Sequence, residues 1–527
     1  MKHMLVVAVL SMVSAALLIL SSPGYGYSFL AWVALVPLLI VIKSSRLSES
    51  FIYSLLAGQL FYFGHLSWMY SIDGISPVIF ALLGLVNAWL FGLFGFAASL
   101  LKRERAFDVI LFPALWALIE YLHHHQGFLS LTWGTLAYTQ YEVPAVNWIA
   151  SLTGIYGISF LIVFVNACIA HAIISLNFQT IAKENQGGAQ FAFPGVRALL
   201  LPAVVMVLIL AIGMVRTFPD DISAGDCIKA GLVQAGLPGY SSSTDDEKRE
   251  ALRRLKQLSL AAAAEHPAFI VWPETAVPGK IPYDSIMVKM LSRISDESGA
   301  SLLVGAAGYD KFQSSERQQT GIANSAFLFK PGERIVGRYE KIMLVPFNEY
   351  LPLRGKITWP RWIVGSNWKN AQPGSEMTIL EADGLRFGVQ ICWENLFPDH
   401  FRKVSAQGVD FMVSITNESF VKAPAAREQM LAFNIFRAIE NHVSILRAAS
   451  TGISAMISPK GEITAMIKDE HGKPEYGAGM LVDKVQATSQ RSFYNRHGDW
   501  FVVALALLMC VYFCFLLGET LFRLKNR

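Results

Sequence analysis

Tyr339-Glu-Lys-Ile-Met-Leu-Val-Pro-Phe-Asn-Glu349 is the stretch from which the organisation of this 527-residue chain can be worked out. It follows two β-rich runs, Asn324–Phe329 and Ile335–Tyr339, which flank Lys330-Pro-Gly-Glu333 and therefore predict a β-hairpin. The charged residues of the stretch come directly after the second predicted strand. A sheet holds such positions firmly while their side chains stay accessible, so the stretch predicts a functional site at a sheet edge.

Two further motifs lie in the same polar part of the chain. Val271-Trp-Pro-Glu-Thr275 places Glu274 after a predicted strand, and Ile391-Cys-Trp-Glu394 places Cys392 at the end of another. Together with Lys341 they supply a carboxylate, a thiol and an ammonium, the groups needed to make and break an acyl thioester. Because long apolar segments flank this polar part, we expect the acyl group to come from, or go to, a molecule in a membrane.

Strand and helix patterns alternate in this polar insert, which predicts an α/β domain. The apolar β-rich runs are Ile228–Val233, Ala268–Trp272, Leu302–Ala306, Phe387–Cys392, Phe411–Thr416, Ser444–Ala448 and Ala455–Ile457. The helical patterns cover residues 244–265, 283–298 and 424–441.

Composition places the remainder of the chain in a membrane. Hydrophobic residues make up 53% of the chain and charged residues only 16%, which is too apolar for an ordinary soluble protein. A helix needs about 20 apolar residues to cross a bilayer, and about eight segments approach that length. These segments lie near 4–20, 28–43, 51–70, 76–101, 108–122, 148–175, 198–215 and 499–522. We therefore predict a multi-pass helical bundle over residues 1–216, a catalytic domain over 217–497, and a last spanning helix with its tail over 498–527.

Basic residues in the short loops predict the orientation of the bundle. If there are eight spans, these loops all fall on one side, which we expect to be the cytoplasm. The residues are Lys2, Lys43, Arg46, Lys102, Arg103, Arg105, Lys183, Arg197, Arg523, Lys525 and Arg527. The catalytic domain then faces the outer side, whereas a miscount of one span would turn it inward. The net charge of +4 is small and gives no indication of a nucleic-acid partner.

The three central residues have distinct expected roles. A cysteine attacks as its thiolate, and an ordinary pKa of about 8.5 leaves little thiolate at neutral pH. We expect Glu274 to take the proton from Cys392. Lys341 and the backbone N–H of Trp393 are then expected to stabilise the negative charge that develops on the attacked carbonyl oxygen.

Two further carboxylates, Glu349 and Glu394, lie close in sequence to the lysine and the cysteine. They are candidates for orienting the lysine or relaying a proton. We expect Lys341 to face solvent, so that its replacement removes activity without weakening the fold. Taken singly, such residues are more often core cysteines or surface charges, and the interpretation depends on the motifs occurring together.

No metal or cofactor is expected. The cysteines at positions 168, 227, 392, 510 and 514 form neither a disulfide framework nor the spacing typical of zinc sites, although pairing of Cys227 with Cys392 stays open. His123, His124 and His125 are consecutive, so on a helix they point in different directions and cannot all bind one ion. We interpret these histidines as an interfacial cluster that touches lipid phosphate.

Residues 350–373 are rich in Pro, Gly and aromatic residues, and their only charges are basic. Trp359, Trp362, Ile363 and Trp368 are predicted to form a lid or a membrane-dipping arm over the site, because Trp favours the boundary between lipid headgroups and chains. The alternative is a loop that packs on its own domain.

The motifs resemble the nitrilase, or carbon–nitrogen hydrolase, superfamily. Its Glu-Lys-Cys triad matches Glu274, Lys341 and Cys392, and its Lys-x-x-Leu-x-Pro-x-x-Glu pattern places Glu349 at the position of an auxiliary glutamate. The apolar part is similar to the apolipoprotein N-acyltransferase family of bacteria. The stretches that carry this similarity are Phe29–Pro37, Pro113–Trp116 with Glu120, Gly154–Phe160 and Arg447–Ser454.

This resemblance implies an αββα sandwich for the catalytic domain and a two-step acyl transfer. The cysteine would take an acyl chain from a phospholipid as a thioester, and the amine of an apolipoprotein's diacylglyceryl-cysteine would accept it, giving a triacylated lipoprotein. The implied location is the bacterial inner membrane, with the catalytic domain on the periplasmic side. The chain departs from the family pattern near Ala235, Phe420 and Met430. These departures affect what the resemblance implies about acceptor contacts and acyl-chain preference more than what it implies about the type of reaction. A membrane-tethered amidase and a catalytically inactive scaffold are the alternatives.

Overall fold

The computed structural model describes residues 2–72, 76–102, 108–185, 194–216, 227–237, 244–314, 317–364, 370–421, 423–474 and 476–525. The chain divides into two compact units. The helical unit comprises Met1–Tyr70, Ile75–Phe218 and His497–Arg527. The α/β unit comprises Ser71–Gly74 and Pro219–Arg496.

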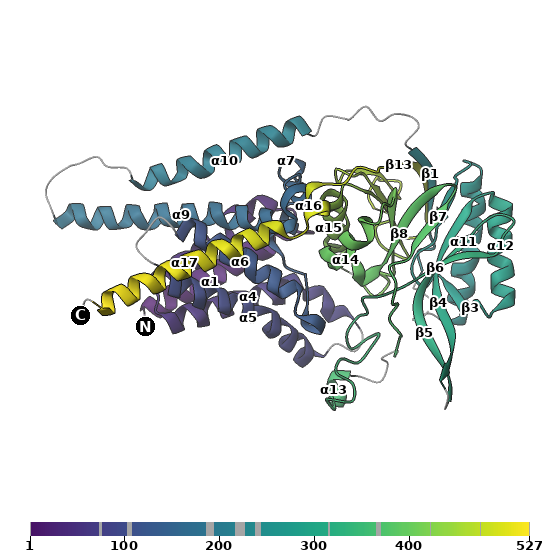
Figure 1. The fold of residues 1–527 in the computed structure, drawn as a ribbon, viewed down its shortest axis with the longest axis horizontal. Helices are drawn as coiled ribbons and strands as arrows, with labels where there is room; N and C mark the ends of the chain where they lie inside the picture. Colours follow the sequence, from purple (N-terminus) through teal and green to yellow (C-terminus); the bar gives the residue numbers. More distant parts are fainter. Residues whose placement is uncertain are drawn as a thin grey trace. The chain divides into compact units, whose positions relative to one another are not determined.

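Long apolar helices make up the helical unit (Figure 1). They are α1 (Lys2–Ser21), α3 (Val36–Ser44), α4 (Leu47–His65), α5 (Pro77–Leu101), α6 (Asp108–His124), α9 (Ile155–Asn185), α10 (Pro194–Arg216) and α17 (Trp500–Lys525). Short helices α2 (Ala31–Ala34), α7 (Pro144–Asn147) and α8 (Ala150–Thr153) connect them. Small residues allow α4 and α5 to approach closely, since a Cβ atom added at Gly95 would lie 2.5 Å from the backbone oxygen of Ser50. Close packing of this kind is what holds helices together in lipid.

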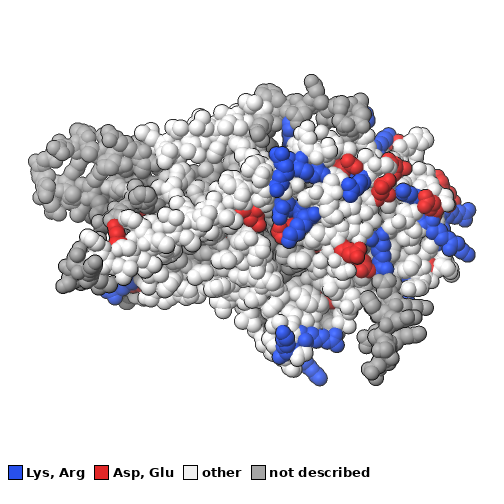
Figure 2. All heavy atoms as spheres, viewed as in Figure 1, with Lys and Arg blue, Asp and Glu red and all other residues white. Residues whose placement is uncertain are grey.

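Helical segments occur at all eight positions where spans were predicted. Among the described residues, four stretches are long and apolar enough to cross a membrane: His3–Ser21, Pro77–Leu101, Ile155–Leu176 and Trp500–Glu519. Ser28–Ser44 and Leu199–Val215 are apolar but shorter. Figure 2 shows a face of the helical unit on which few charged side chains appear among the described residues. These helices fit a membrane part, while the count of eight spans stays a prediction.

Two β-sheets form the centre of the α/β unit. One has the strand order β13-β1-β2-β4-β5-β6, with β3 paired to β4, and the other has the order β12-β11-β10-β9-β8-β7. The strands of the first sheet are β1 (Cys227–Gln234), β2 (Phe269–Val271), β3 (Val277–Ile281), β4 (Ser301–Ser314), β5 (Arg317–Phe329), β6 (Ile335–Glu340) and β13 (Gly479–Gln486). Those of the second are β7 (Ile379–Ala382), β8 (Leu385–Ile391), β9 (Phe411–Thr416), β10 (Ser444–Ala449), β11 (Ala455–Ile457) and β12 (Ile463–Met466).

The two sheets enclose an apolar core. The ring of Phe269 on β2 lies 4.9 Å from that of Phe387 on β8, which stacks at 5.3 Å on Phe411 of β9. Helices α11 (Asp245–Ala263) and α12 (Ser285–Ser298) bury Leu255 and Leu291 in a second core on the outer face of the first sheet. Helices α14 (Pro398–Ser405) and α15 (Pro424–Asn441) contact β8 and β10 of the second sheet (Figure 1). The unit is therefore a helix–sheet–sheet–helix sandwich, and its parallel strands β2, β8 and β9 lead into the loops that carry the site.

Candidate active site

Glu274 stands in the loop that follows β2 and rests directly on β4. A Cβ atom added at Gly305 of β4 would lie 2.3 Å from the backbone oxygen of Pro273 and 2.7 Å from the Cα of Glu274, so only glycine permits this approach. The backbone N–H of Ala276 donates to the Gly305 oxygen at 2.8 Å. Thr275 adopts a positive φ of 50°. The loop is thereby pinned on both sides of a carboxylate that is 5% exposed.

Lys341 follows β6, where its backbone N–H donates to the Asn324 oxygen at 2.8 Å and its own oxygen accepts from Gly374 at 2.9 Å. Its Nζ lies 2.9 Å from Oε2 of Glu349 and 3.7 Å from Oε1 of Glu274. Only 1% of the side chain is exposed, so the expectation of a solvent-facing ammonium is wrong. Burial alone would lower the pKa of Lys341, but the two carboxylates outweigh it and raise that pKa, which keeps the ammonium charged.

Asn324 of β5 links the two carboxylates. Its Nδ2 donates to Oε1 of Glu274 at 2.7 Å and to Oε1 of Glu349 at 3.1 Å. Burial raises the pKa of the Glu349 carboxyl, but Lys341, the backbone N–H of Val345 and the Asn324 amide together bring it below its ordinary value. Glu349 is thus held as an anion in direct contact with the lysine, and orientation of the lysine, one of the two roles considered for it from the sequence, stays a prediction.

Cys392 follows β8 and begins the short helical turn η7 (Cys392–Leu396) with a φ of 53°, a left-handed conformation that is uncommon for a residue other than glycine. The residue is partly exposed. Loss of water around the sulfur and the negative charge of Glu274 raise its pKa to about 12, while Lys341 and a hydrogen bond with Thr416 act in the opposite direction. The charges of Glu274 and Lys341 therefore both act on the Cys392 thiol, which places the three residues within electrostatic range of one another. A raised pKa favours the protonated thiol at neutral pH, so a nucleophilic role for Cys392 would require a base.

Glu394 is held by hydrogen bonds from two strands. Its carboxylate is fully buried and accepts from Tyr339 Oη at 2.8 Å and from the backbone N–H groups of Ile342 and Ile391 at 2.7 Å and 2.8 Å. Burial acts to raise the pKa of the Glu394 carboxyl, but the neighbouring His400 and the backbone N–H groups of Ile391 and Ile342 together bring it below its ordinary value. The carboxylate joins the end of β6 to the end of β8, and so fixes the backbone next to the lysine relative to the backbone next to the cysteine.

The remaining predicted residues lie on η7 and on the segment after Glu349. Trp393 is partly exposed, and its ring lies 6.1 Å from that of Phe397. Trp359 donates from Nε1 to the Pro352 oxygen at 2.7 Å, whereas Trp362 of helix α13 (Arg361–Val364) is 53% exposed. Ile363 is partly buried, and Trp368 lies outside the described residues. Helix α13 stands apart from the sheets on a long connection (Figure 1), and Lys and Arg side chains gather there (Figure 2).

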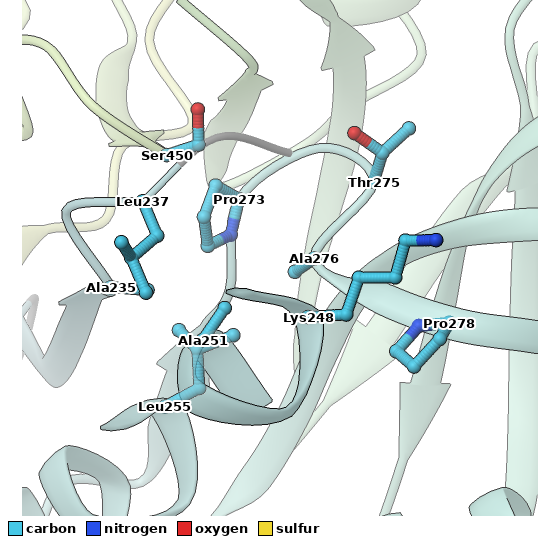
Figure 3. Close-up of a pocket in the computed structure, with 10 residues that line it drawn as sticks. All are labelled: Ala235, Leu237, Lys248, Ala251, Leu255, Pro273, Thr275, Ala276, Pro278 and Ser450. Carbon is cyan, nitrogen blue, oxygen red and sulfur yellow. The ribbon is translucent and has the colours of Figure 1, made fainter. Parts of the chain in front are cut away.

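Asn417, which follows β9, is a site residue that the sequence did not single out for contact with the triad. Its backbone N–H donates to Oε2 of Glu274 at 2.8 Å, and its Nδ2 donates to Oγ1 of Thr275 at 3.2 Å. Its Oδ1 accepts from Ser450 Oγ at 2.7 Å. Thr275 and Ser450 also line a largely apolar pocket beside the Glu274 loop (Figure 3). Each oxygen of the Glu274 carboxylate therefore accepts an N–H hydrogen bond, Oε1 from the Asn324 amide that Glu349 shares and Oε2 from the Asn417 backbone.

The three consecutive histidines of the helical unit have separate partners. His123 Nε2 lies 2.8 Å from Asn87 Oδ1, His124 binds Tyr156 and Thr135 at 2.9 Å each, and His125 Nδ1 lies 2.8 Å from the Tyr121 oxygen. His123 and His124 therefore join α6 to other segments, whereas the His125 bond stays within the end of α6. Across the described ranges, no cluster of His, Cys, Asp or Glu has the arrangement of a metal site.

Two family models match the chain, one in each unit. Residues 14–168 match the apolipoprotein N-acyltransferase N-terminal domain, and residues 229–473 match the carbon–nitrogen hydrolase family. The second match contains Glu274, Lys341, Glu349 and Cys392.

Curated relatives match nearly the whole chain. A protein of Geobacter metallireducens named apolipoprotein N-acyltransferase is 29% identical over 514 residues, which cover 94% of this chain and 92% of the relative. A protein of Treponema denticola named apolipoprotein N-acyltransferase 1 is 26% identical over 544 residues, covering 96% of each chain. Among solved structures, a branch 10 member of the nitrilase superfamily from Saccharomyces cerevisiae matches 51% of this chain and 93% of its own, with 19% identity and a TM-score of 0.38.

Proposed function

We propose that this chain, which belongs to the apolipoprotein N-acyltransferase family, takes an acyl group from a membrane phospholipid and transfers it to the N-terminal amine of a diacylglyceryl-modified apolipoprotein. The observation that supports the chemistry best is the buried arrangement of one ammonium between two carboxylates, with both the ammonium and Glu274 acting on the Cys392 thiol. The product is a triacylated lipoprotein.

The first half-reaction acylates the cysteine. Glu274 accepts the proton of the Cys392 thiol as the sulfur attacks the ester carbonyl of the lipid, because a thiol whose pKa is about 12 offers almost no thiolate at neutral pH. Lys341 stabilises the negative charge that develops on the carbonyl oxygen. The ester C–O bond then breaks, the glycerol oxygen takes the proton from Glu274, and a lysophospholipid leaves behind an acyl thioester.

The second half-reaction returns the enzyme to its starting state. The α-amine of the acceptor attacks the thioester carbon and forms an amide bond, while the bond between carbon and sulfur breaks. Glu274 accepts a proton from the attacking nitrogen and returns one to the leaving sulfur. Lys341 and Glu349 keep their charges through both halves, so the same site serves both reactions with little rearrangement.

The proposed setting is the inner membrane of a bacterium, with eight spanning helices and the α/β unit on the outer side. The four long apolar helices support an integral membrane location. The exposed Trp362 and the exposed basic residues Arg354, Lys356 and Arg361 support an arm that meets lipid headgroups and chains. The acyl donor would then be drawn from the outer leaflet.

An assay with labelled lipid separates transfer from hydrolysis. The purified protein in detergent is given a mixture of phosphatidylethanolamine and phosphatidylglycerol with labelled acyl chains, with or without a synthetic diacylated lipopeptide. We expect a labelled Cys392 thioester without the lipopeptide and labelled triacylated lipopeptide with it, both lost in Cys392→Ala. Free fatty acid as the main product under both conditions would instead identify a membrane-tethered hydrolase, and absence of any label would favour an inactive scaffold.

A further inference from the structure

A buried ion pair lies next in sequence to Asn417, the residue whose backbone N–H binds Glu274. The Glu418 carboxylate is paired with the Arg447 guanidinium, and 1% or less of either side chain is exposed. Glu418 follows Asn417 in the loop after β9, and Arg447 lies within β10. Arg447 also donates from Nε to the Ile453 oxygen at 3.0 Å, so it joins the Asn417 loop to the loop that follows β10.

The loop that contains Asn417 and Glu418 connects the Glu418–Arg447 pair to Glu274. The Asn417 backbone N–H donates to Glu274 at 2.8 Å, and Ser450, at the end of β10, donates to the Asn417 side chain at 2.7 Å. Thr275 and Ser450 are the two residues that Asn417 bridges, and both are labelled in Figure 3. A shift of Glu418 would move Asn417, and with it the hydrogen bond that orients Glu274.

A glycine makes room for the Glu418 carboxylate. Gly452 has a φ of 141°, and a Cβ atom there would lie 2.1 Å from Oε2 of Glu418. The Arg447 guanidinium and the backbone N–H of Ile453 both act on this carboxylate. A buried ion pair costs desolvation free energy that a well-packed apolar pair of similar volume would avoid, so its presence is weak evidence of a stabilising role. The distinguishing feature of this pair is its direct connection to the Asn417 loop.

We propose that Glu418 and Arg447 act as a positioning pair, which holds the Asn417 N–H against the Glu274 carboxylate so that this carboxylate stays aimed as the base for Cys392. This inference rests on one part of the proposed function, namely that Glu274 accepts the proton of Cys392. Neither residue needs to touch the lipid or the acceptor. Arg427, whose charge also acts on Glu418, lies outside this link, because it donates to the Val421 oxygen and stacks on the Tyr476 ring.

The test compares single and double substitutions. Glu418→Gln and Arg447→Met should each slow thioester formation in single turnover by about 10²-fold, the typical effect of a misplacement of about 1 Å, while the KM for phospholipid stays unchanged. The double variant Glu418→Leu/Arg447→Met replaces the pair by apolar groups and should regain thermal stability without regaining the rate. A double variant that recovers both stability and rate would overturn the inference, because a merely structural pair would behave in that way.

A matched control comes from another buried pair. Arg437 and Glu440 of α15 are both fully buried and lie 2.8 Å apart. Glu440→Gln should lower the melting temperature, yet the rate per folded molecule should stay at the wild-type value. If Glu440→Gln slows thioester formation as much as Glu418→Gln does, the special role of the Glu418 pair is refuted.

Alkylation of Cys392 by iodoacetamide separates this inference from the proposed function. The reaction needs no lipid, and its pH dependence senses the position of the Glu274 charge. We expect Glu418→Gln to shift that pH dependence and Glu440→Gln to leave it unchanged. A wild-type protein that is never acylated by phospholipid would refute the proposed transfer, whereas an unshifted alkylation profile in Glu418→Gln would refute the positioning pair.

Discussion

The Lys341 ammonium lies 2.9 Å from the Glu349 carboxylate, and both side chains are removed from solvent. Such a pair is hydrogen-bonded and charge-assisted, and each member satisfies a partner that would otherwise be buried alone. The lysine is therefore part of the folded structure as well as part of the proposed chemistry.

Replacement of Lys341 by Ala should abolish acylation and also destabilise the α/β unit. The substitution leaves Glu274 and Glu349 without their shared cation in a buried site, which typically costs about 3–5 kcal/mol. Thermal unfolding in detergent measures the effect, with Lys403→Ala as the control, because the Lys403 side chain is 54% exposed in its ion pair. Equal melting temperatures for the two variants would show that the burial of Lys341 is of no energetic consequence.

Replacement of Glu274 by Gln should have opposite effects on the acidity and on the reactivity of Cys392. The Glu274 charge raises the pKa of the thiol, so its removal should lower that pKa and move iodoacetamide alkylation to lower pH. The variant also lacks the base, so thioester formation from phospholipid should fall by about 10²–10⁴-fold. If acylation increased together with alkylation, Glu274 would not be the proton acceptor.

The effect of replacing Asn324 on thioester formation should depend on the charge of the new side chain. Asn324→Ala removes the amide that both carboxylates share, a loss of about 1.5–3 kcal/mol for hydrogen bonds to charged groups. Asn324→Asp adds a third carboxylate to the same buried cluster and should reduce the rate of thioester formation further. An Asp variant that is faster than the Ala variant would contradict the electrostatic account of the site.

Replacement of Trp362 and replacement of Trp359, both in the predicted lid, should have different effects on acylation. Trp362 is exposed on α13, so Trp362→Ala should slow acylation by phospholipid more than acylation by a short activated ester. Trp359 packs edge-on against Phe347 at 4.9 Å, so Trp359→Ala should disturb the arm itself and slow both reactions. The ratio of the two rates in each variant is the measurement, and equal ratios would argue against recognition of lipid by Trp362.

Elements with a strong apolar pattern could be predicted from the sequence. Strand β9 (Phe411–Thr416) and helix α15 (Pro424–Asn441) form over the predicted residues. Strands β7, β12 and β13 were missed, because they are partly exposed and lack a continuous apolar run. The pairing of β13 with β1 joins residues about 250 positions apart, a contact that local patterns do not encode.

The same contrast applies to the site. Residues at strand ends could be found, because motifs of charged residues after apolar runs are visible in the sequence. Asn324 was missed although the hairpin contained a signal for it. Ser325 pairs with Glu340, so the next position brings Asn324 opposite Lys341. Asn417 could not be found in this way, since its contact with Glu274 joins the ends of strands in different sheets. The burial of Lys341 likewise depends on packing that no local motif reveals.

The glycine at position 305 has a consequence for how the reaction centre responds to inhibitors. Because the Glu274 loop lies in direct contact with the β4 backbone at this point, Glu274, the proposed base, has no room to move toward β4 when a bulky adduct forms on the cysteine. A warhead that reacts with Cys392 must therefore direct its bulk elsewhere, and short electrophiles with one long flexible tail should label this enzyme faster than compact branched ones.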